Sequence, residues 1–292
     1  MTALLLCLLL SDAPPAFPAT GEVVLAAGDV PWAAAMRERG SLVPLGGDRL
    51  RLYFTGYDGS REGVKRMGLA ESDDGGRTWA VRPRPVSPEG VWVEDPFVLA
   101  LPDGGFEAVA EGRGPDARRL TSDDGLAWTD RGPLDIRGVD GRPISEGPRG
   151  TPVLFVHEGT PHLFYERYDA GVWLAASPDF STWTNISDDP VLVPGPGGWD
   201  GAMIALNQVV RRGGRFVAYY HGTDRRAKPR QWAVGAAFSD DLRTWTKFGA
   251  NPITEPALNE SSGMVVDLPG GPVLFTTHAA VRRRAAVQNE SP

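Results

Sequence analysis

The sequence predicts an all-β fold, a five-bladed β-propeller with four-stranded antiparallel blades. The first observation is a Ser-x-Asp…Trp phrase that occurs four times, at Ser72–Trp79, Ser122–Trp128, Ser177–Trp183 and Ser239–Trp245. The tryptophans are 49, 55 and 62 residues apart, which is the spacing of a four-stranded sheet repeated around an axis. The second is a set of five hairpin patterns, each with two apolar runs around a Gly-containing turn. The third is the even spread of 36 Gly and 26 Pro along the chain as turn residues.

The five hairpins set the order of the blades. They cover residues 41–54, 98–110, 152–165, 208–220 and 264–276. Each of the first four is followed by a third strand, such as Val172–Ala176, and then by the Ser-x-Asp…Trp turn. No such sequel follows the fifth hairpin, so we expect the N-terminal strand Glu22–Ala27 to close the last blade. We expect residues 20–284 to form one propeller domain, with residues 285–292 as a C-terminal tail.

The repeated phrase has a structural interpretation. Asp and Ser side chains bond nearby backbone N–H groups and fix a turn, while Trp packs between neighbouring strands. These aspartates are therefore not catalytic candidates.

The composition limits the partners and the compartment. The net charge of −7 and pI of about 5.2 argue against a nucleic-acid partner, because phosphate backbones are bound by clustered Lys and Arg. The apolar run at residues 3–10 is too short to span a membrane, and residues 1–19 are interpreted as a signal peptide. A secreted or periplasmic protein is expected, although no Lys or Arg precedes the apolar run. An untranslocated N-terminus is the alternative. Cys7 is the only cysteine, so cleavage would leave no disulfide.

Polar residues recur where the site should lie. In an antiparallel hairpin, the first strand begins and the second strand ends at the same edge, so these segments of all five blades should converge on one face. Glu111, Glu166, His221 and His278 occupy equivalent places after four consecutive second strands. Polar borders of turns are common for structural reasons, but together these residues favour a pocket. The candidate substrate-binding residues are Arg39, Trp92, Glu111, Arg149, Trp199, Asp200, Asn207, His221 and His278.

Carboxylates that face one another across a cleft, with aromatic platforms, suit hydrolysis of a glycosidic bond. One acid protonates the leaving oxygen while a second activates water or attacks the sugar, and their surroundings separate their pKa values. Arg39 and Arg149 could bind substrate, and neutralisation of the crowded acids is an equally good interpretation of both. The sequence has no phosphate-binding loop or zinc spacing, so we expect no organic cofactor and no metal at the site. A structural Ca²⁺ in the axial channel stays open, although no loop has recognisable ligand spacing.

Two short motifs resemble those of the five-bladed propeller glycosidases of glycoside hydrolase family 43 and of the related families 32, 68 and 130. These are Val93–Val98, similar to the second-blade Asp-Pro motif, and Glu146-Gly-Pro148, similar to the third-blade general-acid motif. The resemblance implies a base on blade one, an orienting Asp95 and a general acid, Glu146, with Glu166 as its rival. Blade one departs from the pattern, because it has no Asp-Pro and offers Glu38 beside Arg39.

The function expected from these patterns is a glycoside hydrolase that cleaves polysaccharide or oligosaccharide substrates, inverting by resemblance, with Glu38, Asp95, Glu146 and Glu166 as the catalytic candidates. The missing blade-one Asp motivates an alternative, a propeller that binds glycans without cleaving them. A glycoside phosphorylase also stays open, with His221, His278 and Arg39 as phosphate ligands. A sialidase is disfavoured, because the axial segments lack three arginines at equivalent places. The sequence determines neither the sugar nor the oligomeric state.

Overall fold

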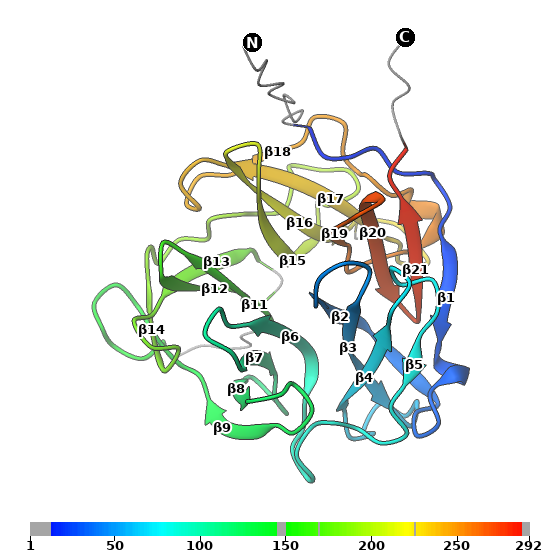
Figure 1. The fold of residues 1–292 in the computed structure, drawn as a ribbon. Helices are drawn as coiled ribbons and strands as arrows, with labels where there is room; N and C mark the ends of the chain where they lie inside the picture. The colour runs from blue at the N-terminus through cyan, green and yellow to red at the C-terminus, as the bar shows by residue number, and fades with distance from the viewer. Residues whose placement is uncertain (1–12, 145–149, 169, 225, 288–292) are drawn as a thin grey trace, which may run out of the picture.

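Five sheets are arranged around a central axis (Figure 1), and the predicted five-bladed propeller is confirmed. The computed structural model describes residues 13–144, 150–168, 170–224 and 226–287. The expected signal peptide lies largely outside these residues, so secretion stays a prediction. Within the described part of the chain, no helix has the length and apolar character needed to cross a membrane.

The first two blades have the expected four antiparallel strands each. Blade 1 consists of β2 (Ala35–Pro44), β3 (Leu50–Tyr57), β4 (Arg66–Ser72) and β5 (Ala80–Val81). Blade 2 consists of β6 (Glu94–Ala100), β7 (Phe106–Glu111), β8 (Ala117–Ser122) and β9 (Thr129–Pro133).

The next two blades follow the same order, with one addition. Blade 3 consists of β11 (Gly150–His157), β12 (Thr160–Glu166), β13 (Val172–Ala176) and β14 (Thr182–Asn185). A short fifth strand, β10 (Asp135–Arg137), pairs in parallel with β14, so this blade has one strand more than predicted. Blade 4 consists of β15 (Met203–Arg212), β16 (Arg215–Thr223), β17 (Trp232–Ser239) and β18 (Thr246–Lys247).

Blade 5 is closed by the chain start, as predicted. Its strands are β19 (Met264–Leu268), β20 (Gly271–His278), β21 (Ala280–Ala285) and β1 (Glu22–Ala26). Two 3₁₀ turns, η1 (Ala27–Asp29) and η2 (Pro256–Leu258), complete the described elements.

The prediction that no third strand follows the fifth hairpin was wrong, because β21 is that strand and β1 is the fourth. Strand β21 contains the run Arg282-Arg-Arg284, which in the sequence looks too polar for a paired strand. The side chain of Arg284 is nevertheless buried, and its Nη2 donates to Glu260 Oε2. An ion pair thus offsets the cost of burying this charge inside the blade.

Side chains of one strand alternate between two blade interfaces. On β3, Leu52 and Phe54 belong to the largest apolar cluster, whereas Tyr53 belongs to a second cluster. The same alternation occurs on β16, where Tyr220 lies in the largest cluster and Tyr219 in a third. Because successive side chains of a strand point to opposite faces, each blade is buried on both sides.

The Ser-x-Asp…Trp phrases form tight turns, as predicted. Asp74 Oδ1 accepts hydrogen bonds from the backbone N–H groups of Arg77 (2.9 Å) and Thr78 (3.0 Å), and Trp79 Nε1 donates to the Gly76 carbonyl (3.2 Å). Burial opposes ionisation of Asp74, but the hydrogen bonds from Thr78 and Ser72 outweigh it and hold the pKa at about 2. Each such turn follows the third strand of a blade, at the edge opposite to the start of the first strand.

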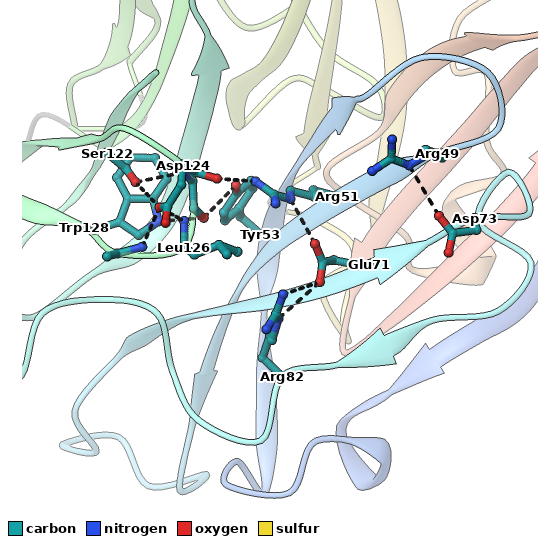
Figure 2. A network of polar contacts seen from close by, with 12 residues as sticks. Arg49, Arg51, Tyr53, Glu71, Asp73, Arg82, Ser122, Asp124, Leu126 and Trp128 are labelled. Atoms are coloured by element: carbon teal, nitrogen blue, oxygen red, sulfur yellow. Dashed lines mark hydrogen bonds and ion pairs between the residues drawn. The ribbon is translucent and has the colours of Figure 1, made fainter. Parts of the chain in front are cut away.

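The turns also tie neighbouring blades together (Figure 2). Tyr53 of blade 1 donates through its hydroxyl to the Gly125 carbonyl in the turn of blade 2 (3.0 Å), and Arg51 Nη1 donates to the Asp124 carbonyl (2.6 Å). Glu71 accepts from both Arg51 and Arg82, so the arginine that reaches across the interface is itself held in place.

The inner strands begin with an irregularity that positions side chains at the axis. The ladder shifts register between Glu94 and Phe97 of β6, and between Gly150 and Val153 of β11. At these shifts Asp95 and Thr151 adopt φ of 51° and 43°, in the left-handed region that few non-Gly residues occupy. Such backbone bulges redirect a side chain and often lie beside functional sites.

Candidate functional site

A pocket of about 450 Å³ lies at the end of the channel where the inner strands begin. It is lined by Asp95, Glu111, Thr151, Glu166, Met203, Ile204, Ala205, His221, Arg230 and Trp232. These residues come from three consecutive blades. Asp95 and Glu111 belong to blade 2, Glu166 to blade 3, and His221 to blade 4.

The structure confirms the positional equivalence that the sequence suggests. Glu111 is the last residue of β7, Glu166 of β12 and His278 of β20, while His221 lies two residues before the end of β16. In the ladders, Glu111 pairs with Glu94, Glu166 with Gly150, and His221 with Ala205. The ends of the second strands therefore bring one polar side chain after another to the same face.

Asp95 is buried at the bulge of β6, and its backbone N–H donates to Thr55 Oγ1 of the neighbouring blade (2.8 Å). This bond fixes the backbone where φ is positive. The carboxylate is therefore presented to the pocket by a rigid segment that both blade 1 and blade 2 hold.

Glu111 is the carboxyl group whose proton affinity is changed most clearly. Burial, and next the charge of Asp95, raise its pKa from 4.5 to about 8, although the N–H of Thr151 donates to its Oε1 at 2.6 Å. Glu111 is therefore protonated at neutral pH. A carboxyl group kept neutral in this way can act as a general acid.

The carboxyl groups of Glu166 and Glu111 both lie close to Gly150. A Cβ atom at position 150 would stand 2.4 Å from Glu166 Oε2 and 3.3 Å from Glu111 Oε1. The absence of a side chain at Gly150 thus makes room for both carboxyl groups.

Arg39 supplies the positive charge in this cluster. Its side chain, on β2, is buried, and its pKa is lowered by burial while Asp95, Glu111 and Glu166 oppose that effect. Arg39 Nη1 is buried and has no hydrogen-bond partner among the described residues. The arginine therefore offsets part of the negative charge of this cluster and keeps a donor available.

His221 is a neutral polar group in the wall of the pocket. Burial, the charge of Arg39 and His278 lower its pKa to about 3. Its Nδ1 lies 3.0 Å from Asn207 Nδ2, and its ring meets Trp232 edge to face at 5.0 Å between centroids. Asn207 thus holds the imidazole, which leaves the ring edge to contact a ligand.

Of the pocket residues that sequence reasoning missed, the two with charged or aromatic side chains are Arg230 and Trp232. They lie at the start of the third strand of blade 4, with the guanidinium of Arg230 at 5.8 Å from the ring centroid of Trp232. In each blade, the third strand begins at the face where the second strand ends. Inspection of the residues at the start of each third strand would therefore have found Arg230 and Trp232.

Six predicted binding residues do not line this pocket: Arg39 and Asn207, described above, and the four that follow. Asp200 Oδ2 accepts from Lys247 Nζ (2.6 Å) and from the Tyr220 hydroxyl (3.0 Å), and Trp199 stacks on Tyr220 at 5.5 Å. His278 is held by Ser261 and Asn259, at 3.2 and 3.3 Å.

Trp92 is the fourth, and it lines a neighbouring cavity instead. Three other predicted residues lie outside what the structure describes. These are Glu146 and Arg149, and the side chain of Glu38 on β2.

A second cavity of about 540 Å³ lies at the other ends of the inner strands. Its walls are mainly apolar, with Val43, Phe97 and Val210 among them, and none of its lining residues is an acid. Acid–base chemistry therefore points to the smaller, carboxylate-lined pocket. Within the described residues, no group of three or more His, Cys, Asp or Glu side chains is arranged to hold a metal ion.

Comparison with solved structures shows that the fold is that of the five-bladed propeller glycosidases. A glycosyl hydrolase from Bacteroides ovatus matches with a TM-score of 0.75 and 18% identity, over 96% of this chain and 94% of the other. An endo-arabinase from Bacteroides thetaiotaomicron matches with a TM-score of 0.63 and 12% identity, over 92% and 99%. A thermostable family-43 glycoside hydrolase matches with a TM-score of 0.61 and 15% identity, over 90% and 95%. No protein-family model and no curated protein matches the sequence.

Proposed function

We propose that this protein is a glycoside hydrolase in which Glu111 is the general acid. One observation carries the proposal: three carboxyl groups from two adjacent blades meet around the buried Arg39, and Glu111 keeps its proton at neutral pH. The names of the structures that share the fold support the same reaction class.

The reaction follows from the protonation states. Glu111 gives its proton to the glycosidic oxygen, the bond between C1 and that oxygen breaks, and the electron pair stays on the leaving oxygen. Water adds to C1 and loses a proton to a carboxylate, for which Glu166 is the described candidate. Glu166 then releases the proton that it took from water, and Glu111 regains one from solvent, so that atoms and charges balance as hydrolysis.

Asp95 and Arg39 have supporting roles in this proposal. The negative charge of Asp95 raises the pKa of Glu111 and so keeps the acid protonated. Arg39 lowers the cost of placing Asp95 and Glu166 in one pocket as anions. The role of Asp95 agrees with the orienting aspartate that the family resemblance implies.

Inversion at C1 is the expected outcome by resemblance. Glu166 and Glu111 both lie close to Gly150, and closely spaced carboxyl groups are typical of retaining enzymes. The stereochemistry of the product therefore tests the expected inversion. NMR of the first-formed anomer decides between them. A retained anomer would make Glu166 the nucleophile.

The proposal is tested with the amide variants Asp95→Asn, Glu111→Gln and Glu166→Gln on a panel of chromogenic glycosides. Each substitution removes a charge or a proton and keeps the shape of the side chain, so we expect a loss of about 10²–10⁴-fold in kcat for Glu111→Gln. The matched control is Glu158→Gln, an exposed glutamate at the opposite end of blade 3.

Unchanged rates in all three variants, with an active wild type, would refute the proposal. Oligosaccharide binding without product over long incubation would support the glycan-binding propeller instead.

A further inference from the structure

A third cavity lies at the end of blade 2 that carries Glu111. It has a volume of about 270 Å³, room for one sugar ring, and its walls include Trp92, Arg113, Asp116 and Arg118. Trp92 stands two residues before Glu94 and Arg113 two residues after Glu111, and these two glutamates pair across the β6–β7 ladder. The cavity and the Glu94–Glu111 pair therefore lie at the same end of blade 2.

One hydrogen bond and one charge effect link the wall of this cavity to Glu111. Trp92 Nε1 donates to Glu94 Oε2 (3.1 Å), and the charge of Glu94 is among those that raise the pKa of Glu111. A sugar that accepts the proton of Glu111 on its glycosidic oxygen would thus have one ring in the carboxylate-lined pocket and the other beside Trp92.

Cations surround Trp92. The guanidinium carbon of Arg113 lies 5.9 Å from the Trp92 ring centroid, and Lys65 Nζ lies 5.4 Å from it. Lys65 is buried and donates to the Gly63 carbonyl (3.2 Å), so it is fixed in this position. The indole ring is therefore close to two positive charges, which cation–π attraction stabilises there.

Arg113 is the cation available to a ligand. It is exposed and forms no hydrogen bond or ion pair among the described residues, whereas Arg118 donates to Asp130. Asp116 is the one acid in the wall of this cavity. A planar guanidinium binds a carboxylate through two parallel hydrogen bonds, a geometry that a neutral hydroxyl group cannot match.

We infer that this cavity is a subsite for an acidic sugar, a uronate, whose carboxylate binds Arg113 and whose ring contacts Trp92. The inference deepens the proposed function and rests on it, since it assigns the uronate to the leaving-group side of the bond. The carboxylate-lined pocket suits the same anion less well, because Asp95 and Glu166 lie there and already interact with Arg39. The added negative charge beside Glu111 would favour its protonated form further.

Binding of free monosaccharides tests the subsite without any need for turnover. Ligand-detected NMR titrations compare galacturonate and glucuronate with galactose and glucose, on the wild type and on Arg113→Gln, Arg113→Lys, Arg230→Gln and Arg142→Gln. Arg142 is an exposed arginine on the outer side of blade 3 and serves as the matched control.

We expect the uronates to bind about tenfold more tightly than the neutral sugars, which corresponds to one charge-assisted contact of about 1.4 kcal/mol. Arg113→Gln should abolish this preference, Arg113→Lys should keep part of it, and Arg142→Gln should leave it unchanged. Equal affinity for acidic and neutral sugars would overturn the inference.

Three further outcomes distinguish the subsite from the inner pocket and from the proposed function. A preference that survives Arg113→Gln and is lost in Arg230→Gln would place the carboxylate in the inner pocket and overturn the inference. Glycosidase activity without uronate preference removes only the subsite. Uronate preference without hydrolysis of any glycoside removes only the proposed function.

Discussion

Glu111 of blade 2 accepts a 2.6 Å hydrogen bond from the backbone N–H of Thr151, the residue with positive φ in the bulge of blade 3. The same carboxyl group is held protonated at neutral pH by burial and by the charge of Asp95. The position of the Glu111 carboxyl group thus depends on the backbone geometry of blade 3.

The glycine between the two acids is the first target. Gly150→Ala would place a methyl group 2.4 Å from Glu166 Oε2, so that carboxyl group must move. We expect kcat to fall by about a hundredfold, because small displacements of reacting groups are costly, while the melting temperature changes little. Gly249→Ala, where a Cβ meets nothing within 4 Å, is the control. Full activity of Gly150→Ala would contradict the assignment of Glu166.

The second prediction concerns the pH dependence of activity. With a pKa of about 8, Glu111 loses its proton above that pH, so kcat/KM should fall on the alkaline side with an apparent pKa near 8. A pH–rate profile measures it. A profile that stays flat to pH 10 would exclude Glu111 as the acid.

The same shift affects stability. The folded-state pKa of Glu111 is above its ordinary value, so its contribution is fully present below about pH 4.5 and is lost as the pH rises to about 8. Glu111→Gln should therefore be more stable than the wild type at pH 8 and lose this advantage at pH 4.5. Urea unfolding at the two pH values checks the difference, and an equal effect at both would be inconsistent with the shift.

The pKa of His221 is shifted in the opposite direction to that of Glu111, so its effect on stability has the opposite pH dependence. Its folded-state pKa is about 3, below the ordinary value of 6.5, so the stability of the neutral form is present above pH 6.5 and is lost as the pH falls toward 3. His221→Gln should reduce the acid sensitivity of the free energy of unfolding between pH 6.5 and 4. His157→Gln, on the opposite end of blade 3, should leave that sensitivity unchanged.

Arg39 should be the most important single charge for folding. Arg39→Met would leave Asp95, Glu111 and Glu166 without their central cation, and we expect a loss of about 3–5 kcal/mol in the free energy of unfolding at pH 7. The loss should shrink at low pH, where the carboxylates bind protons. A loss that is independent of pH would show that Arg39 acts by packing alone.

Much of the fold was predictable because the blades repeat. The hairpins and Ser-x-Asp…Trp turns fix the number and order of the blades, and closure by residues near Glu22 follows from the incomplete last blade. The strand β21 was missed because Arg282, Arg283 and Arg284 read as an exposed segment. Only the folded chain brings Glu260 to Arg284 and makes its burial tolerable.

The site was predictable in position and less so in chemistry. The recurrence at strand ends indicates Glu111, Glu166 and His221, and all three line one pocket. Asp200 also lies in an acidic segment, but it does not line the pocket and instead accepts a hydrogen bond from Lys247. The direction in which its side chain points depends on neighbours in the folded protein, which the sequence does not reveal. From the sequence, Glu111 was predicted to bind substrate and not to act as an acid. Its raised pKa depends on burial and on the nearby charge of Asp95, and both become visible only in the folded structure.

The most direct test of Glu111 as the general acid compares leaving groups. Phenyl glycosides need protonation of the leaving oxygen, whereas dinitrophenyl glycosides do not, because the dinitrophenolate leaves readily as an anion. For Glu111→Gln we predict a loss of about a thousandfold in kcat/KM on the phenyl glycoside and of less than about tenfold on the dinitrophenyl glycoside of the same sugar. An equal loss on both substrates would contradict the role of Glu111 as proton donor.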